Sequence, residues 1–584
     1  MQENQRLSYY IKESKLIDVS KYGKKIKVSV LGSFTLNGIE ETLRVKCSEI
    51  DVGCITYVSG YNQYNQEILN NESQLYKFCP DITFLILDTR NMLENSFYSI
   101  YDLTESERRK IIEKKLDEVL QLIKVFTKNS NSKLIITNLA IPRYSSYGIY
   151  EMKVNYGLME MVMDFDLKLN EQIREIESVY VYDFDGFVRK YGEINTFDFK
   201  QFLIGDIKIS FDYIPHLIDD LIGFIKPILG LNKKCIVLDL DNTLWGGIIG
   251  EDGLEGIRLG DTPEGKAFVE FQEILLGLNQ RGIILAINSK NNYDDAIKVI
   301  HEHPNMILKE ENFSRLKINW DDKVENMKAI ASELNIGLDS IVFFDDDPMN
   351  IEYMQMNLPQ VLTIRLSEDP SQYAQKLMSM NDFDVLKITN EDKNRRKMYL
   401  EEKQRKDFES YETNLDDFLK KLNIKLIFKS ANSFTIPRIS QLTLKTNQFN
   451  LTTKRYQEEE IKNMLLNKNY WIRCVQVKDK FGDSGITGVF IIKKEESEWV
   501  IDSFLLSCRI MGRKIEDGIL SYIVQKAKEN NIDLIKGKFI PTQKNKPCET
   551  FLEDFGFMKE NSFWTYKTNS TLKTPEHLSI IEEK

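Results

Sequence analysis

Two aspartates directly after an apolar run are the first residues of this chain that could do chemistry. The stretch "KKCIVLDLDNTLWGG" (233–247) places Asp239 and Asp241 after the apolar residues "CIVL". Residues two apart on a strand point the same way, so both carboxylates can face one pocket where the chain leaves the sheet. Adjacent carboxylates repel each other unless a cation lies between them or one of them keeps a proton. A Mg²⁺ site satisfies the first condition.

Further polar residues follow this pair in order along the chain. Ser289 ends the apolar run "GIILAINS", Lys323 lies in "NWDDK", and "FFDDDP" supplies Asp345 and Asp346. "DLDNT" resembles the first motif of the haloacid-dehalogenase (HAD) superfamily of phosphotransferases, and these companions resemble its later motifs. Three of the four groups end predicted strands of a parallel sheet, and ligands bind outside the carboxyl ends of such strands. We therefore expect one phosphoryl-transfer site rather than separate helix caps.

Phosphoryl-transfer chemistry assigns a role to each residue that matches the motifs. Asp239 is the expected nucleophile and forms an aspartyl phosphate. Asp241 is expected to protonate the leaving oxygen and then to activate water. Ser289 is expected to hydrogen-bond the phosphoryl oxygens, and Lys323 to neutralise them. Two neighbouring residues are expected to contact the substrate: Thr243 and Asn288.

The same comparison predicts how Mg²⁺ is held. The expected ligands are Asp239, the backbone carbonyl of Asp241, and one of Asp345 and Asp346, with a slight preference for Asp345. Mg²⁺ keeps several waters and takes few protein oxygens, which suits this set.

The stretch between Asp241 and Asn288 leaves no room for a lid domain. It contains only the loop "WGGIIGEDGLEGIRLG" and the helical pattern "PEGKAFVEFQEILLGLNQRG". An uncapped site does not readily enclose a small ester, but it can accept a phosphoryl group presented on something large. The sequence therefore favours a substrate that is held by a protein.

A second anion-binding pattern lies near the carboxyl end. "DSFLLSCRIMGRKIEDG" runs from a strand into a helix, with Arg509 and Gly512 at the junction, and amides at a helix start bind anions. It resembles the pyrophosphate loop of the GNAT acyltransferases, and "PTQKNKPCETFLEDFGF", which contains Asn545, resembles their later Asn region. The loop departs from that family at Lys514, where Gly or Ala is usual, which leaves coenzyme A binding open.

A cysteine and a polar stretch in the same carboxyl-terminal part of the chain are candidates for acyl chemistry. A helix start and the neighbouring Arg509 would activate the Cys508 thiol as a nucleophile, and the alternative is a small core residue. The stretch "QLTLKTNQFNLTTKRY" (441–456) is rich in Asn, Thr and Gln. If this stretch is functional, it forms one side of an acyl or pantetheine site, with Asn447, Gln448 and Phe449 as contacts. The alternative is that it forms a surface helix and turn.

The amino-terminal part of the chain (1–226) resembles the Ser-Gly-Asn-His (SGNH) hydrolases through three stretches. They are "VLGSFT", which contains Ser33, "PDITFLILDTRN", and "DYIPH", which contains His216. Arg90 stands where that family has Asn, and the spacing from Asp to His is one residue too long. We therefore expect a degenerate hydrolase fold that binds rather than cleaves. Live catalysis by Ser33 and His216 is the alternative.

The patterns that must position these residues predict a multidomain α/β protein. Apolar runs such as "KIKVSVLGSF", "DITFLILDTR" and "SKLIITNLAI" alternate with helical patterns such as "ESERRKIIEKKLDEVLQLIKVFTK", as in parallel sheets with crossover helices. The expected parts are an SGNH-hydrolase-like domain (1–226), an uncapped HAD-like Rossmannoid domain (227–389), a charged helical linker (390–422), a GNAT-like α/β domain (423–570) and a flexible tail (571–584).

Composition narrows the function classes. The 584 residues are 42% hydrophobic and 29% charged, as in globular proteins, and no segment has the roughly 20 consecutive apolar residues that span a membrane. A net charge of −11 argues against nucleic-acid binding. The seven cysteines show no paired spacing, and the amino terminus lacks the apolar core of a secretory signal. We therefore expect a cytoplasmic protein with reduced thiols.

Taken together, "CIVLDLDNTLWGGIIGEDGLEGIRLG", "QLTLKTNQFNLTTKRY" and "SCRIMGR" resemble the FkbH-like proteins, over nearly the whole chain. The resemblance implies a glyceryl transferase and phosphatase. Such a protein dephosphorylates 1,3-bisphosphoglycerate, or a similar acyl phosphate, and loads the three-carbon unit on the phosphopantetheine thiol of an acyl carrier protein for polyketide-type biosynthesis. The alternatives are a free-standing phosphatase fused to a coenzyme A-dependent N-acyltransferase, and a non-catalytic scaffold that binds a carrier protein.

Overall fold

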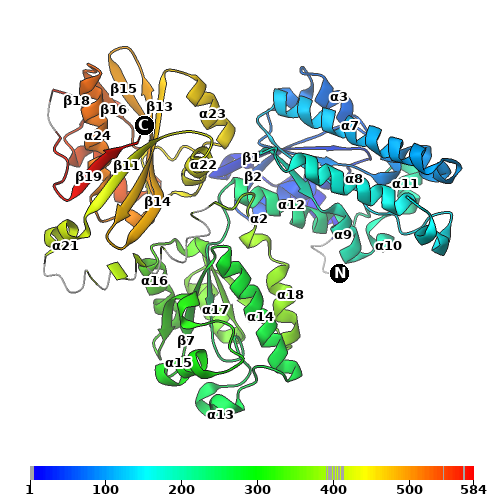
Figure 1. Ribbon diagram of the computed structural model, residues 1–584, viewed down its shortest axis with the longest axis horizontal. Coiled ribbons are helices and arrows are strands. Elements are labelled where there is room, and N and C mark those ends of the chain that lie inside the picture. The colour runs from blue at the N-terminus through cyan, green and yellow to red at the C-terminus, as the bar shows by residue number, and fades with distance from the viewer. Residues whose placement is uncertain are drawn as a thin grey trace. The chain divides into compact units, whose positions relative to one another are not determined.

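The computed structural model describes residues 6–389, 414–542, 545–569 and 572–583, with residues 391, 398, 401, 402, 404, 405 and 408 between the first two ranges. The chain divides into two compact units, Met1–Ile225 and Lys226–Lys584. Three separate sheets, each with its own helices, confirm the predicted α/β class (Figure 1). Within the described part of the chain, no helix is both long enough and apolar enough to cross a membrane.

The first unit is built on a five-stranded sheet in the order β2-β1-β3-β4-β5, and all its neighbours are parallel. The long helices α7 and α8 cover one face of it (Figure 1). The strands are β1 (Lys24–Gly32), β2 (Val52–Val58), β3 (Ile82–Ile86), β4 (Lys133–Thr137) and β5 (Val179–Tyr182). The main helices are α2 (Ile39–Glu49), α7 (Glu105–Asn129), α8 (Leu158–Ile173), α9 (Phe184–Tyr191) and α12 (Ile214–Ile228).

Local sequence explains where α7 begins and which face it buries. Thr104 caps its first turn through a capping box with Glu107, which satisfies amides that the helix leaves free. Its buried residues recur at intervals of three and four, as in the run Ile112, Leu116, Val119 and Ile123. That apolar stripe packs on the sheet, so α7 is the crossover between β3 and β4.

The middle of the chain forms a second parallel sheet, in the order β10-β9-β6-β7-β8. The predicted strands are β6 (Cys235–Leu238), β7 (Ile284–Ser289) and β9 (Ile341–Asp345), and β8 (Phe313–Ile318) and β10 (Leu362–Arg365) complete the sheet. The helices are α13 (Ile249–Gly256), α14 (Pro263–Gln280), α15 (Tyr293–Glu302), α16 (Lys323–Glu333), α17 (Pro348–Asn357) and α18 (Tyr373–Met378). Because β6 lies between β7 and β9, the ends of all three predicted strands are neighbours.

The third sheet is mostly antiparallel, in the order β17-β18-β16-β15-β14-β13-β11-β19, with β12 paired to β15. Only β15–β16 and β11–β19 are parallel pairs among its described strands. The strands are β11 (Ile424–Ser430), β12 (Phe449–Asn450), β13 (Tyr470–Asp479), β14 (Gly482–Lys494), β15 (Glu498–Leu506), β16 (Leu534–Gly537), β17 (Met558–Glu560), β18 (Phe563–Lys567) and β19 (Leu578–Glu582). The helices are α21 (Leu415–Leu422), α22 (Ile436–Lys445), α23 (Glu458–Leu466), α24 (Ile515–Glu529) and α25 (Phe551–Asp554).

Two expected boundaries of this part are wrong. Most of the predicted linker 390–422 lies outside the described residues, but its last turns form α21, whose Leu419 and Leu422 are buried in the core of the third domain. The predicted flexible tail 571–584 contains β19, which pairs with β11 from Ile424↔Leu578 onward. Both segments are rich in charge, and only the buried contacts of their apolar residues reveal that they belong to the domain.

Candidate functional site

The middle sheet brings the predicted phosphoryl-transfer residues to one edge. Leu238, the last residue of β6, is level with Ile287 of β7 and Phe344 of β9, so Asp239 follows at the height of the two strand ends. The backbone amide of Asp239 donates to the carbonyl of Phe344 at 3.1 Å, which extends the ladder by one residue. Lys323 is the first residue of α16, the helix that connects β8 to β9.

Lys323 lies between two carboxylates. Its Nζ is 3.1 Å from Asp239 Oδ1 and 2.6 Å from Asp345 Oδ2, and its side chain is 4% exposed. Burial lowers the pKa of Lys323, but Asp239 and Asp345 outweigh that effect and raise it. The predicted substrate residue Asn288 donates instead to the backbone carbonyl of Lys323 at 2.8 Å, so it positions the lysine.

Asp241 is held by donors on both carboxylate oxygens. Oδ1 accepts from the indole of Trp245 at 2.9 Å and from the amide of Ile249 at 3.1 Å, and Oδ2 accepts from Asn291 Nδ2 at 3.0 Å. Burial nevertheless raises the pKa of Asp241, and the repulsion of Asp239 adds to it. A raised pKa favours the protonated carboxyl, which is the form that a general acid requires.

Asn291 is a site residue that the sequence analysis missed. It is buried, and its amide lies 3.0 Å from Asp241 Oδ2 and 3.2 Å from the Ser289 hydroxyl, so it links the two predicted residues. The only signal in the sequence is its place two residues after Ser289. The predicted contact Thr243 is fully buried, and its hydroxyl has no hydrogen-bond partner within the described structure.

Three carboxylates of this edge can share a cation. Asp239, Asp345 and Asp346 each offer an oxygen, and the three oxygens lie within 4.8 Å of one another. Burial and the repulsion of Asp239 raise the pKa of Asp345 to about 6, against the opposing effect of Lys323, and the same two causes raise the pKa of Asp346. Oxygen-only ligands and mutual repulsion fit Mg²⁺. The side chain of Asp241 lies outside this group of three.

The edge carries no lid. Residues 239–284, all of them described, form a loop with one short antiparallel bridge between Gly246 and Arg258, followed by α13 and α14. Both helices pack into the core of the same domain. The side of the sheet that carries Asp239 is therefore not enclosed by an inserted domain.

The acyl-site candidates of the third domain divide into two groups. Asn447, Gln448, Cys508 and Arg509 line one cavity, and Gly512 lines an adjoining one with Cys508 and Arg509. The other two candidates have structural roles. They are Phe449, which packs against Phe504 and Phe551 in the core, and Asn545, whose buried amide donates to the carbonyls of Asn450 and Ile540.

Cys508 does not begin the long helix, contrary to the prediction. It opens the single 3-10 turn Cys508–Ile510, and α24 begins only at Ile515. The amides of the first turn of α24 therefore do not account for a reactive thiol. The side chain of Cys508 is half-buried, and its carbonyl accepts from the amide of Asn335. Lys514 caps α24 with a left-handed φ of 54°, and its Nζ lies 3.5 Å from Asp416.

The structure does not bring Ser33 and His216 together as a catalytic pair. The hydroxyl of Ser33 accepts the amide of Asp88 at 2.8 Å, and the ring of His216 stacks on Tyr191 with centroids 5.1 Å apart. No hydrogen bond joins the two residues in the described part of the chain. The two residues therefore do not form a hydrogen-bonded pair here, and whether the first unit binds or hydrolyses stays a prediction.

The chain is similar to a solved structure, the N-terminal part of the protein BF1531 from Bacteroides fragilis, which contains a phosphatase domain and is complexed with Mg. The two are 29% identical, the match covers 65% of this chain and 99% of the other, and the TM-score is 0.60.

Two acetyltransferases align with smaller parts of the chain. A GNAT-family acetyltransferase from Staphylococcus aureus is 15% identical over 24% of this chain and 99% of its own (TM-score 0.20). The ribosomal-protein-S18-alanine N-acetyltransferase from Escherichia coli is 8% identical over 24% and 94% (TM-score 0.21). No curated protein matches the chain. Residues 27–226 match the family described as FkbH, N-terminal domain, so this part of the chain is similar to the FkbH proteins.

Proposed function

We propose that this chain is a Mg²⁺-dependent phosphatase and glyceryl transferase. The observation that carries the phosphatase half is the buried Lys323 ammonium held between Asp239 and Asp345 at the carboxyl edge of a parallel sheet. A preorganised cation beside a carboxylate nucleophile suits a phosphoryl group, whose oxygens gain charge during transfer. The Mg-bound phosphatase-domain relative from Bacteroides fragilis supports the same class of reaction.

Asp239 and Asp241 have different roles in the proposed reaction. A carboxylate oxygen of Asp239 attacks phosphorus, the bond from phosphorus to the leaving oxygen breaks, and Asp241 gives that oxygen its proton. Water then attacks the aspartyl phosphate, Asp241 takes the proton, and inorganic phosphate leaves. The donors around Asp241 fix the direction of its carboxyl, and burial raises its pKa, which favours the protonated form.

Asp239 and one of Asp345 and Asp346 would hold the metal. When bound there, Mg²⁺ supplies positive charge to the phosphoryl oxygens. Both side-chain oxygens of Asp345 already have partners, because Oδ2 accepts from Lys323 and Oδ1 accepts from the amide of Asp347 at 2.9 Å. We therefore favour Asp346 over Asp345 as the direct ligand, in place of the slight preference drawn from the sequence.

The proposed substrate is 1,3-bisphosphoglycerate or a similar acyl phosphate, and the proposed partner is an acyl carrier protein. The carrier's pantetheine thiolate attacks the acyl carbonyl and displaces one phosphate, which forms a thioester. The remaining phosphate monoester is hydrolysed at Asp239. An open phosphatase edge and a separate cavity lined by Asn447, Gln448 and Cys508 both support a substrate that travels on a tether.

Asp239→Asn tests the phosphatase half. The change is nearly isosteric but removes the nucleophile, so phosphate release from the monoester should fall by more than about 10³-fold while melting changes little. Asp369→Asn, which changes an exposed aspartate of the same domain, is the matched control. Intact-mass spectra of the carrier should then show an acyl unit that keeps its phosphate. Release at the wild-type rate would refute the assignment.

Cys508→Ala tests whether the acyl unit rests on the enzyme before transfer. If it does, the enzyme-bound acyl mass and the loading of the carrier should be lost together. A variant that loads its carrier at the wild-type rate would show direct transfer, with Cys508 as a packing residue. Cys474→Ala, a buried strand cysteine, is the control.

The fused phosphatase and N-acyltransferase is the competing function. It predicts that phosphate release from a small ester does not depend on a carrier protein, and that the third domain binds coenzyme A. Measuring phosphate release with and without the loaded carrier separates the two functions. Loss of all activity in Asp239→Asn would exclude the scaffold.

A further inference from the structure

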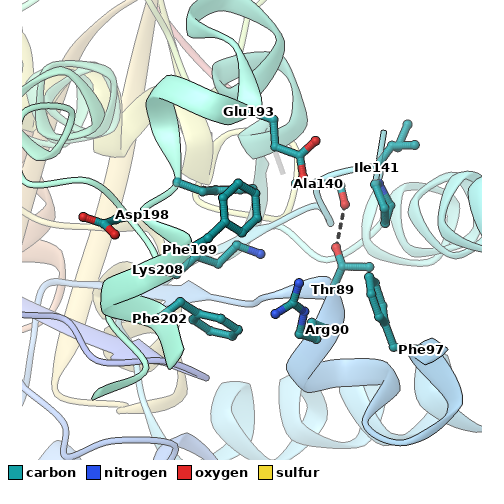
Figure 2. Close-up of a pocket in the computed structure, with 12 residues that line it drawn as sticks. Thr89, Arg90, Phe97, Ala140, Ile141, Glu193, Asp198, Phe199, Phe202 and Lys208 are labelled. Carbon is teal, nitrogen blue, oxygen red and sulfur yellow. Dashed lines mark hydrogen bonds between the residues drawn. The ribbon is translucent and has the colours of Figure 1, made fainter. Parts of the chain in front are cut away.

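The first unit contains a cavity that neither proposed reaction uses. It lies where α5 (Thr89–Leu93) leaves β3, and α10 (Glu193–Thr196) and α11 (Phe199–Gly205) form its other side (Figure 2). With its open mouth it measures about 440 Å³, but only about 40 Å³ admits the centre of a water molecule. A ligand of only a few carbons fits such a space.

Arg90 is the free cation of this cavity. Its guanidinium carbon lies 5.1 Å from the ring centroid of Phe202, 5.4 Å from Phe97 and 5.5 Å from Tyr98. These rings orient the guanidinium without neutralising it. No carboxylate lies within 4.0 Å of it in the described part of the chain. A planar guanidinium is suited to bind a carboxylate with two hydrogen bonds.

Glu193 faces the same space from the opposite side. Its carboxylate and the guanidinium of Arg90 both point into the cavity in Figure 2. Glu193 Oε2 is buried and accepts no hydrogen bond from any described residue. Burial raises the pKa of Glu193, against the opposing effects of the Arg143 amide and of the Arg143 and Arg90 charges. A buried acceptor without a donor costs free energy that a ligand's donor group would recover.

The other charged side chains of the cavity contact a carboxylate or point away from the cavity. The ammonium of Lys208 contacts the buried carboxylate of Asp88 and lies 4.2 Å from the ring of Phe197. Asp198 caps α11 by accepting the amide of Gln201 at 2.9 Å, and in Figure 2 its carboxylate points away from the cavity. Among the described residues that line the cavity, the charged side chains left for a ligand are therefore the guanidinium of Arg90, which donates, and Oε2 of Glu193, which accepts.

We propose that this cavity binds a small carboxylic acid that carries a hydroxyl or ammonium group on the neighbouring carbon. The ligand's carboxylate binds the Arg90 guanidinium, and its donor group binds Glu193 Oε2. The apolar rings of Phe97, Phe197 and Phe202 exclude water and limit the ligand's size. We expect the site to bind without cleaving, because the Ser33 hydroxyl accepts the amide of Asp88 and no hydrogen bond joins Ser33 to His216 in the described part of the chain. The inference is independent of the phosphatase and transferase activities.

Calorimetric titration of the full chain tests the ligand chemistry. The probes are D-glycerate and L-serine, with propionate, which lacks the donor, and the methyl esters, which lack the carboxylate. The proposal expects at least one of the two acids to bind more tightly than about 10 mM and its ester to bind about 10- to 100-fold more weakly, because a charge-assisted hydrogen bond is lost. Propionate should also bind more weakly. Glycerate alone would identify a hydroxy acid as the ligand, and serine alone an amino acid.

Three variants locate the site. Arg90→Gln should weaken binding of the best acid about 10- to 100-fold, and Glu193→Gln should weaken serine more than glycerate, because an amide still accepts from a hydroxyl but does not balance an ammonium. Asp198→Asn, on the same cavity but pointing away, should bind as the wild type does. The proposal fails if neither acid binds, if an ester binds as well as its acid, or if Arg90→Gln and Glu193→Gln both match Asp198→Asn. The acid and ester comparison uses the wild-type chain, so it decides the ligand chemistry even if Arg90→Gln does not fold.

Discussion

Lys323→Met removes the ammonium between Asp239 and Asp345 while keeping an unbranched side chain of similar length. In the native protein that ammonium is buried and lies within 3.1 Å of one carboxylate and 2.6 Å of the other. After the substitution two buried carboxylates face each other without a cation. Either they repel, or one of them takes up a proton, and both outcomes destabilise the middle domain near neutral pH.

The size of the effect follows from the burial of the group. Removing one partner of a buried ion pair costs about 3–5 kcal/mol, because the charge that remains has lost its compensation. Lys317→Met is the matched control, because Lys317 is 25% exposed and pairs with the 36% exposed Glu333. An ion pair of that kind contributes about 0–1 kcal/mol. In the double variant Lys323→Met with Asp345→Asn, the second substitution removes one of the two carboxylates, so the loss should be smaller than in Lys323→Met alone.

Hydrogen exchange measures this stability domain by domain. Without Mg²⁺, peptides that cover β6 and β9 should exchange about 10²- to 4 × 10³-fold faster in Lys323→Met than in the wild type, and peptides from β1 and β4 should not change. Added Mg²⁺ should recover part of the protection, since it replaces the missing charge. The reasoning is refuted if β6 and β9 exchange no faster than in Lys317→Met, or if the double variant is less stable than the single one.

Three further perturbations test other parts of the structure. Burial raises the pKa of Asp166 to about 7, and the charges of Asp185 and Asp183 add to the rise. Between about pH 4 and pH 7 the folded state therefore holds a proton that the unfolded state has lost. The unfolding free energy should fall as the pH rises through this range and stay constant above it. Calorimetry at pH 5 and pH 8 checks this, and Asp166→Asn should lack the slope; an equal slope in both proteins would contradict it. Mg²⁺ at 100 times its Kd should add about 2.7 kcal/mol to the unfolding free energy of the middle domain and so raise its melting temperature. Asp346→Ala should remove most of this rise. An undiminished rise would exclude Asp346 as a ligand. Asp241→Asn should slow the pre-steady-state burst with an alkyl phosphate about 10²- to 10⁴-fold but spare p-nitrophenyl phosphate, whose leaving group needs no proton; equal losses with both substrates would argue against a general acid.

The phosphatase edge was largely predictable because its geometry is local. Each of the three acidic or polar clusters directly follows an apolar run, and a parallel sheet carries the carboxyl ends of its strands to one edge whatever their exact order. Spacing within the strand ends also made Asp239 and Asp241 a pair. Lys323 follows no predicted strand, and only the resemblance to the HAD motifs placed it at this edge.

Roles that depend on distant partners were not predictable in this way. Asn288 and Asn545 are polar residues in motif-like stretches, yet both use their amides to hold the backbone carbonyls of residues far along the chain or in a packed loop. Asn291 has no motif of its own and acquires its role only because Asp241 lies beside it. A side chain's hydrogen-bond partner is decided by tertiary packing, which residue type and spacing do not encode.

The sequence by itself determined the α/β class, the three blocks, and the order of the phosphoryl-transfer residues, because hydrophobic periodicity and strand-end motifs are short-range signals. The tertiary structure alone decided that α21 and β19 complete the third domain, since β19 pairs with a strand that lies about 150 residues earlier. It alone separated Cys508 from the start of α24, and it alone set Arg90 and Glu193 against each other across one small cavity. Such juxtapositions join segments that are distant in sequence, and they arise only when the whole core has packed.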